Sequence, residues 1–335
     1  MIMFSGEDMA YSAVSTALMR RIIQTANTDI LMFNAEISRI RQVRLFRKVL
    51  PRHRKPNLLM ILVTNGGDPD SAYRIARCLQ RNYEKVTVCI SGICKSAGTL
   101  VALGAHELAF TDYGEIGPLD IQLAKKDDLW GQESGLTVTT ALTALHENAQ
   151  DAFDHFLVSL TTRSGGRITV RTASEIAAKL TQAIYSGISE QIDPIHLGEV
   201  NRSMAIARDY GKRLMDKGNN AKEEETLQTL ISGYPSHSFV IDKEEAATLF
   251  KNVRECTPDE VALLEDLEPY SLTPMPADSP WVRFISDDVA EEDLANAQTA
   301  SAQQVQEQPD HGGTVAQAET NVQTNGASAV PPAAS

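Results

Sequence analysis

The sequence contains no uninterrupted apolar run near the length of about 20 residues that a membrane-spanning helix requires. Its most apolar stretch, residues 58–63, has only the length of a strand. The N-terminal segment places Glu7 and Asp8 ahead of its first basic residues and shows no small-residue cleavage site after an apolar block. A secretory signal has the opposite arrangement. We therefore expect a cytoplasmic protein without an integral membrane segment.

Cysteine is scarce, and no two cysteines form a CxxC pair or a metal-ligand spacing. The four present are Cys78, Cys89, Cys94 and Cys256. In a chain of this size they are interpreted as reduced thiols. The zinc-protease motif HExxH is also missing, because the fourth residue after His106 is Phe110 and the fourth after His146 is Gln150. We expect neither a metal site nor a cofactor.

Basic residues are absent after Arg283, whereas eight acidic residues follow it. Residues 286–335 are rich in Ala, Gln, Thr and Asn and nearly lack large apolar side chains. Such a segment cannot bury enough surface to offset the entropy of ordering, so we expect a disordered acidic tail.

Residues 20–55 have the opposite charge, with ten basic residues and two acidic ones. The tail could dock on this basic block and shield the site, and unchanged activity after its deletion would contradict that hypothesis.

The basic block itself is typical of a solvated helix face whose long side chains cover apolar neighbours. Nucleic-acid or phosphate binding is the alternative that such a block raises. The sequence has no aromatic interleaving or nucleic-acid motif around these residues. We therefore do not expect nucleic acid as a partner.

From residue 29 to residue 122, short apolar segments alternate with helical ones. Residues 58–63 are apolar at every position, as in a strand buried on both faces of a parallel sheet. Residues 69–83 begin with proline and then carry apolar residues at helical spacing. Residues 86–90 and 107–111 predict further strands, and residues 96–104 a helix of small residues. Repeated units of this kind predict an α/β fold with a parallel-rich sheet covered by helices.

We divide the chain into four parts on this basis. They are an N-terminal helix (1–28), a β/α core with the active site (29–136), a helical region that completes the domain and provides an oligomer interface (137–285), and the disordered acidic tail (286–335). Within the helical region, the apolar periodicity predicts helices over 141–160, 173–184, 198–215 and 223–231.

Three motifs follow successive predicted strands. Thr64-Asn65-Gly66-Gly67 lies just past the first buried strand, where paired glycines turn the chain sharply and expose N–H groups. Gly92-Ile-Cys-Lys-Ser96-Ala97-Gly98 follows the next strand and opens a helix. Gly114-Glu-Ile-Gly117-Pro118-Leu119-Asp120 follows the third. Because ligands bind at the carboxyl edge of parallel sheets, the three motifs are expected to meet there.

Ser96 is the candidate nucleophile. Its hydroxyl would attack while the N–H of Ala97 and one from Gly66 or Gly67 stabilise the oxyanion, assisted by the positive end of the helix. The alternative is an ordinary serine that caps the helix. The G-x-S-x-G elbow of α/β-hydrolases does not fit, since Cys94 stands where its first glycine belongs.

The order strand–NGG–helix, strand–GxxxSAG–helix, strand–GxIGPLD resembles the Clp/crotonase superfold. Within that superfold the chain is similar to the serine dehydrogenase proteinase family, relatives of signal-peptide peptidase A and of the Clp proteolytic subunit. Further similar stretches are KSAGTLVALGAHELAF, GPLDIQ, QIDPIHLGEV and GYPSHSFVID. The resemblance implies a homo-oligomeric serine peptidase that acts on polypeptides. It places the nucleophile at Ser96, the oxyanion hole at Gly66, Gly67 and Ala97, and site-shaping residues at Gly117, Pro118 and Asp120.

The general base stays open between several residues. Relatives of signal-peptide peptidase use a Ser–Lys dyad, which would assign the role to Lys125 if burial lowers its pKa. The family's Thr-His-Asp segment appears here as Ser236-His237-Ser238, so His237 is the second candidate although the aspartate is absent. Lys95 and His106 rank below both.

Two other functions are compatible with the same fold. One is a partner-binding scaffold that has lost its base and is inert to serine-directed probes. The other is an acyl-CoA enzyme of the crotonase branch, in which backbone N–H groups polarise a thioester. The second predicts activity that is insensitive to Ser96→Ala.

Overall fold

The computed structural model describes residues 11–50, 55–119, 122–124, 132–190, 192–291 and 293. By its internal contacts the chain divides into two units, Met1–Ala290 and Glu291–Ser335. Most of the predicted acidic tail, including residues 294–335, lies outside the described residues.

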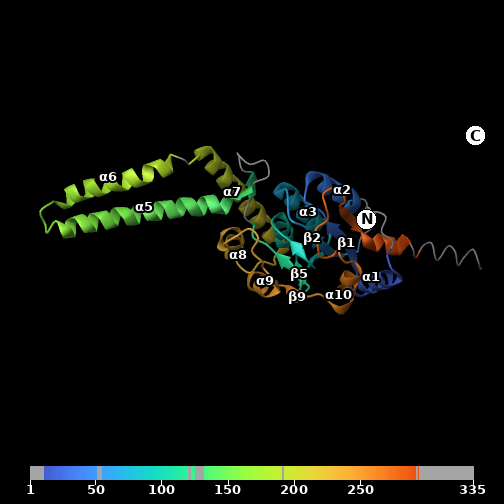
Figure 1. Ribbon diagram of the computed structural model, residues 1–335. Helices are drawn as coiled ribbons and strands as arrows, with labels where there is room; N and C mark the ends of the chain where they lie inside the picture. The colour runs from blue at the N-terminus through green and yellow to red at the C-terminus, as the bar shows by residue number, and fades with distance from the viewer. Residues whose placement is uncertain are drawn as a thin grey trace, which may run out of the picture. The chain divides into compact units, whose positions relative to one another are not determined.

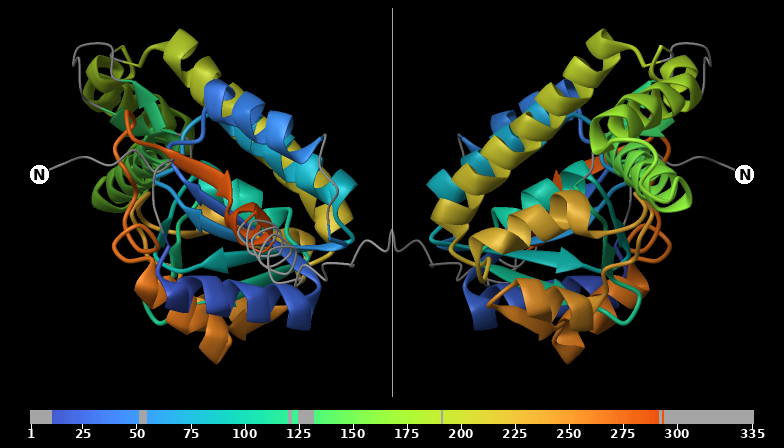
Figure 2. Two further views of the ribbon diagram at one scale, coloured as in Figure 1. Left: turned by 90° about the vertical axis from the view of Figure 1, so that its right-hand side faces the viewer. Right: turned by 90° about the vertical axis from the view of Figure 1, so that its left-hand side faces the viewer.

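A six-stranded sheet forms the centre of this unit, in the order β10-β1-β2-β3-β5-β9 (Figures 1 and 2). Its parallel strands are β1 (Thr28–Asn34), β2 (Asn57–Val63), β3 (Lys85–Ile90), β5 (Glu107–Phe110) and β9 (Val253–Glu255). The edge strand β10 (Trp281–Phe284) pairs with β1 in the antiparallel sense. The predicted parallel-rich sheet is therefore confirmed.

Helices cover both faces of the sheet because its central strands are apolar on both sides. In β1, Leu31 and Phe33 join one core cluster and Ile30 and Met32 join the other. The first cluster is covered by α2 (Arg39–Val49), α3 (Pro69–Asn82), α4 (Ala97–Leu103), α7 (Pro194–Gly218), α8 (Glu224–Gln228) and α9 (Lys243–Leu249). The second is covered by α1 (Ala13–Ala26) and α10 (Pro258–Asp266). The predicted helical covering is confirmed.

Two small sheets and a turn of π-helix complete the core unit. β4 (Ile93–Cys94) pairs in parallel with β6 (Glu115–Ile116), and β7 (Gln122–Ala124) pairs with β8 (Gln132–Ser134). The π-helical turn Thr229–Gly233 follows α8 directly. The β4–β6 pair joins the segment before Ser96 to the motif that begins at Gly114.

Helices α5 (Gly135–Arg163) and α6 (Val170–Ser189) form a long antiparallel hairpin that extends away from the sheet (Figure 1). Tyr185 on α6 donates a hydrogen bond to the carbonyl of Asn148 on α5, at 3.0 Å. Among the described residues, no helix combines the length and apolar character needed to cross a membrane.

The packed part of the chain continues beyond residue 286, where the sequence predicts the start of the tail. Residues 285–291 are helical. Val289 is buried in the second core cluster, and the Ser286 hydroxyl accepts a hydrogen bond from Ile30 N at 3.2 Å. The composition of this segment is polar, but Ile285 and Val289 are both buried in the second core cluster.

Candidate active site

The turn after β2 is joined to the segment that leads into α4. Thr64 N donates to Ile93 O at 2.8 Å, and Lys95 N donates to Thr64 O at 2.9 Å. Gly66 has φ of 109°, a left-handed conformation that other residues rarely adopt. A Cβ built on Gly66 would lie only 2.8 Å from Ser96 Cβ and 3.2 Å from Ala97 N. Only glycine fits this position, and its backbone lies directly beside Ser96.

Ser96 occupies the N-cap position of α4 but does not cap it. Its side chain makes no capping hydrogen bond, in contrast to Ser12, Asp68 and Thr257 at other helix starts. Its backbone has φ 52° and ψ −115°, a conformation that costs free energy for a residue with a Cβ. Residues held in such conformations cluster at functional sites. The interpretation of Ser96 as an ordinary capping serine therefore has no support in the geometry.

The three backbone amides predicted to form the oxyanion hole differ in their hydrogen bonding. Gly66 N already donates to the Thr64 hydroxyl at 3.0 Å. Among the described residues, neither Gly67 N nor Ala97 N has a hydrogen-bond acceptor in the protein. Of the two glycines that the sequence offered, Gly67 is thus the one whose N–H is available.

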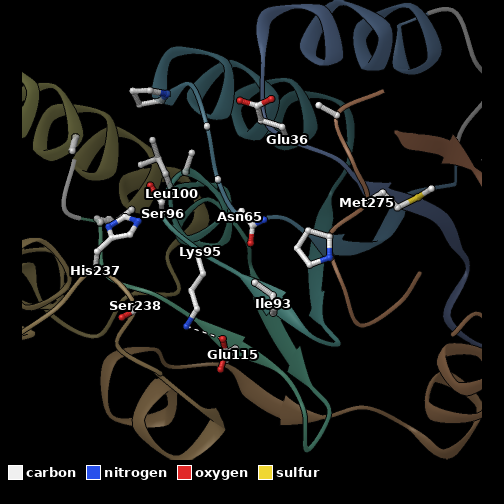
Figure 3. A pocket seen from close by; sticks show the side chains of 18 of the residues that line it. Glu36, Asn65, Ile93, Lys95, Ser96, Leu100, Glu115, His237, Ser238 and Met275 are labelled. Atoms are coloured by element: carbon white, nitrogen blue, oxygen red, sulfur yellow. Dashed lines mark ion pairs between the residues drawn. The ribbon is translucent and has the colours of Figure 1, made fainter. Parts of the chain in front are cut away.

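These groups line a cavity of about 1000 Å³ (Figure 3). Ser96, Asn65 and Lys95 lie at its centre, and His237 and Ser238 approach from the loop before α9. Apolar walls come from elements far apart in the sequence: Ile93, Leu100, Leu119, Ala207, and the segment from Pro274 to Ala277.

Lys95 precedes Ser96 in the chain, yet its ammonium is directed elsewhere. Figure 3 shows the side chain extending away from Ser96 toward Glu115. Lys95 Nζ lies 2.9 Å from Glu115 Oε1 and donates to the carbonyls of Ile116 (3.3 Å) and Phe239 (3.1 Å). With three acceptors around it, this ammonium holds the walls of the cavity together.

Of the other candidate bases within the described residues, His237 and not His106 lines the cavity. His106 lies just before β5, at the opposite end of the strands, and its Nδ1 accepts a hydrogen bond from Val86 N at 3.0 Å. Burial, and then the nearby Lys85, lower the pKa of His106. Lys125 and Asp120 lie outside the described residues.

Gly117 and Pro118, predicted to shape the site, are buried next to it. The Thr99 hydroxyl on α4 donates to Gly117 O at 2.8 Å and accepts from Gly117 N at 3.3 Å. A Cβ on Gly117 would meet Lys95 Cδ at 2.6 Å. The segment around Gly117 is thus hydrogen-bonded to α4 and packed against the Lys95 side chain.

Sequence reasoning missed Asn34, which is fully buried at the end of β1 and anchors one wall of the cavity. Its amide nitrogen donates to Tyr270 O (2.6 Å) and Thr273 O (2.8 Å), and its oxygen accepts from Met275 N (2.7 Å). Glu36 and Glu115, the two carboxylates that line the cavity, were also not assigned a role. A polar residue at the end of an otherwise apolar strand was the available signal for Asn34.

No family model and no curated protein sequence matches this chain. Solved structures of the 1510-N membrane-bound stomatin-specific protease are similar to it at 13% sequence identity. A serine-to-alanine mutant has a TM-score of 0.41, with 77% of this chain and 92% of that chain covered. A lysine-to-alanine mutant in complex with a substrate peptide has a TM-score of 0.42, with 77% and 87% covered.

Proposed function

We propose that this chain is a serine peptidase in which Ser96 is the nucleophile. The observation that supports this most directly is the uncapped Ser96 hydroxyl, held in a strained backbone conformation at the wall of the cavity. A serine with a purely structural role would accept a hydrogen bond from an N–H group at the start of the helix. The strained backbone of Ser96 would then cost free energy without any compensating interaction. Nucleophilic catalysis would account for both the uncapped hydroxyl and the strained backbone.

In the proposed reaction, Ser96 Oγ attacks the carbonyl carbon of a peptide bond and passes its proton to a base. The oxyanion that forms accepts hydrogen bonds from Ala97 N and Gly67 N. Collapse of the tetrahedral species expels the amine, which takes up the proton from the base and leaves an ester on Ser96. Water then attacks the ester carbonyl and passes its proton to the base, and collapse of the second tetrahedral species releases the acid product and returns the proton to Ser96 Oγ.

His237 and Lys125 remain the candidates for the base. His237 is supported by its place in the cavity wall, where an imidazole nitrogen could accept the proton. Lys95 is not proposed, because an ammonium engaged with Glu115 and two carbonyls would have to break those bonds before acting. The pH profile of hydrolysis in His237→Gln separates the two remaining assignments.

A fluorophosphonate probe, which modifies activated serines, tests the proposal. We expect wild-type protein to be labelled and Ser96→Ala to be inert. Ser238→Ala is the matched control, because this serine lines the same cavity without an adjacent oxyanion site, and it should be labelled like the wild type. Equal labelling of wild type and Ser96→Ala would contradict the proposal.

One observation favours the second candidate function, a partner-binding scaffold without catalysis. Within the described part of the chain, Ser96 Oγ makes no hydrogen bond, so no base contacts it there. A wild-type chain that binds peptides in the cavity but resists the probe at every pH would establish this alternative.

We also propose that the chain forms a homo-oligomer through the α5–α6 hairpin. Four aliphatic residues recur every fourth position on α6 and are between 37% and 53% exposed: Ile176, Leu180, Ile184 and Ile188. A stripe of this kind is costly in water and is buried when helices associate. Light scattering should give a smaller mass for Leu180→Glu with Ile184→Glu than for the wild type. Gln182→Glu with Ser186→Glu, which adds the same charge to the same helix, should leave the mass unchanged.

A further inference from the structure

Helix α2 presents to solvent a face on which aliphatic and basic side chains are interleaved. Its inward residues Gln42, Leu45 and Val49 are buried against the sheet. On the outward side, the three exposed aliphatic residues are Ile40 (71% exposed), Val43 (37%) and Leu50 (60%). At 100° per residue, Arg39, Arg44 and Arg47 occupy the same side of the helix as these three.

The charge of this helix is opposite to that of the whole protein. α2 contains five basic residues and no acidic one, whereas the chain has a net charge of −13. The neighbouring α3, which lies beside α2 in the same layer (Figure 2), adds the exposed Arg74 and Arg81. Partial burial, and then the nearby cations Arg44 and Arg283, lower the pKa of Lys48, whereas Asp287 and Asp288 act in the opposite direction. These two carboxylates lie beyond β10, so the basic residues of α2 and α3 still outnumber them on this layer.

We propose that the outward face of α2 docks on the surface of an anionic lipid bilayer. Helices that lie in the bilayer interface combine aliphatic side chains, which enter the boundary of the acyl chains, with basic side chains, which meet the lipid phosphates. Ile40, Val43 and Leu50 supply the first part, and the arginines between them supply the second. The absence of any carboxylate on α2 means that nothing on the helix itself repels the phosphates.

Two other occupants fit this surface less well. Nucleic acid would match the charge, but its phosphates give no reason for three aliphatic side chains to stay exposed between the arginines. A second copy of the chain would bring ten basic side chains of two α2 helices together, and like charges in close contact repel. The lipid surface accounts for both the charge and the aliphatic residues.

Docking through α2 would hold the cavity close to the bilayer. Glu36, which lines the cavity, lies two residues before Ser38, the N-cap of α2. Ile37 N donates to Gly66 O at 2.8 Å, so the start of this helix is joined to the turn beside Ser96. The proposal itself does not depend on whether Ser96 is catalytic.

Flotation of the full-length protein with lipid vesicles tests the proposal. We expect binding to vesicles of phosphatidylcholine with one third phosphatidylserine, and at least tenfold weaker binding to pure phosphatidylcholine. Raising the salt from about 0.1 M to about 0.5 M should weaken the binding, because it screens the arginines. Absence of any preference for the anionic vesicles would overturn the proposal.

Two variants separate the contributions of charge and aliphatic surface. Arg39→Glu with Arg47→Glu reverses two exposed charges, and Ile40→Ser with Leu50→Ser removes two exposed aliphatic side chains. Each should weaken vesicle binding by tenfold or more without changing the thermal unfolding curve. Arg171→Glu with Lys179→Glu on α6 makes the same charge change far from α2 and should bind like the wild type. If the Ile40→Ser, Leu50→Ser variant binds vesicles normally, or a duplex oligonucleotide binds more tightly than vesicles do, the surface is a general polyanion site and the lipid proposal is wrong.

Discussion

The Lys95 ammonium lies 2.9 Å from the Glu115 carboxylate, so the residue directly before Ser96 is fixed to strand β6. The two side chains are 13% and 25% exposed. Because the pair is largely removed from water, loss of one partner leaves the other poorly solvated.

Glu115→Leu should therefore lower the free energy of unfolding by about 1–3 kcal/mol and slow the labelling of Ser96. Glu115→Gln should have a smaller effect, because an amide oxygen still accepts a hydrogen bond from the ammonium. Urea denaturation and the labelling rate measure the two effects. Glu255→Leu is the control, since the carboxylate in its ion pair with Lys243 is exposed to solvent and its loss should leave the stability nearly unchanged.

Gly66→Ala tests the close approach of the turn to Ser96. The new methyl group would meet Ser96 Cβ at 2.8 Å, and the residue would be forced to keep φ of 109°. We expect destabilisation of about 1–3 kcal/mol and loss of probe labelling. Gly198→Ala is the matched control, because this glycine lies in α7 with open space around it. That change should stabilise the protein by about 0.5–1 kcal/mol, so a similar loss in both variants would contradict the assignment.

Asn34→Leu tests the anchoring of the cavity wall. The change removes three hydrogen bonds and leaves Met275 N and two carbonyls without their buried partner. We expect a loss of about 2–4 kcal/mol in the free energy of unfolding, together with a higher KM for peptides if the wall moves. Asn82→Ala on α3, which removes a partly buried hydrogen bond to Cys78 O, should cost less than about 1.5 kcal/mol. Equal losses in the two variants would show that Asn34 has no special role.

The ion pairs that Glu107 forms with Lys85 and Arg254 predict that the stability of the protein depends on pH. Burial alone would raise the pKa of Glu107, but hydrogen bonds from Lys85 and Arg254 outweigh it and the pKa is lowered. A carboxyl whose pKa is lower in the folded state stabilises the protein above its unfolded pKa of about 4.3, and this contribution is lost as the pH falls through the folded pKa.

Urea denaturation between pH 6 and pH 3 measures that loss, with values chosen to span the reference pKa of about 4.3. Wild-type protein should lose more stability over this interval than Glu107→Gln, which cannot titrate. Parallel curves for the two proteins would show that the Lys85–Glu107–Arg254 contacts do not act as charged pairs.

The elements that the sequence predicts correctly are those set by local patterns. Residues 58–63 match β2 within one residue, because a run of apolar residues with no helical periodicity leaves a buried strand as its best solution. Pro69 at the first turn and a glycine pair before it similarly fix the start of α3. The meeting of Ser96, Gly67 and Ala97 at one cavity follows from the edge rule for parallel strands.

Contacts between distant segments were not predictable in the same way. β10 is only four residues long and completes the sheet by pairing with β1, some 250 residues earlier in the chain. Nothing local in that short segment distinguishes an edge strand from a loop. α10 did have a usable signal, since Thr257 and Glu260 form a capping box around Pro258. The partner of Lys95 depends on the β4–β6 pairing, which sequence spacing alone does not give.

The cavity wall from Pro274 to Ala277, with β10 behind it, has a consequence for biosynthesis. A ribosome delivers Ser96 and both glycine-rich turns long before it delivers residues 274–284, and domains fold as their segments emerge. The nascent chain thus carries the Ser96 hydroxyl on an open groove with β1 still unpaired along one side. The cavity beside Ser96 is complete only after nearly the whole domain has left the exit tunnel.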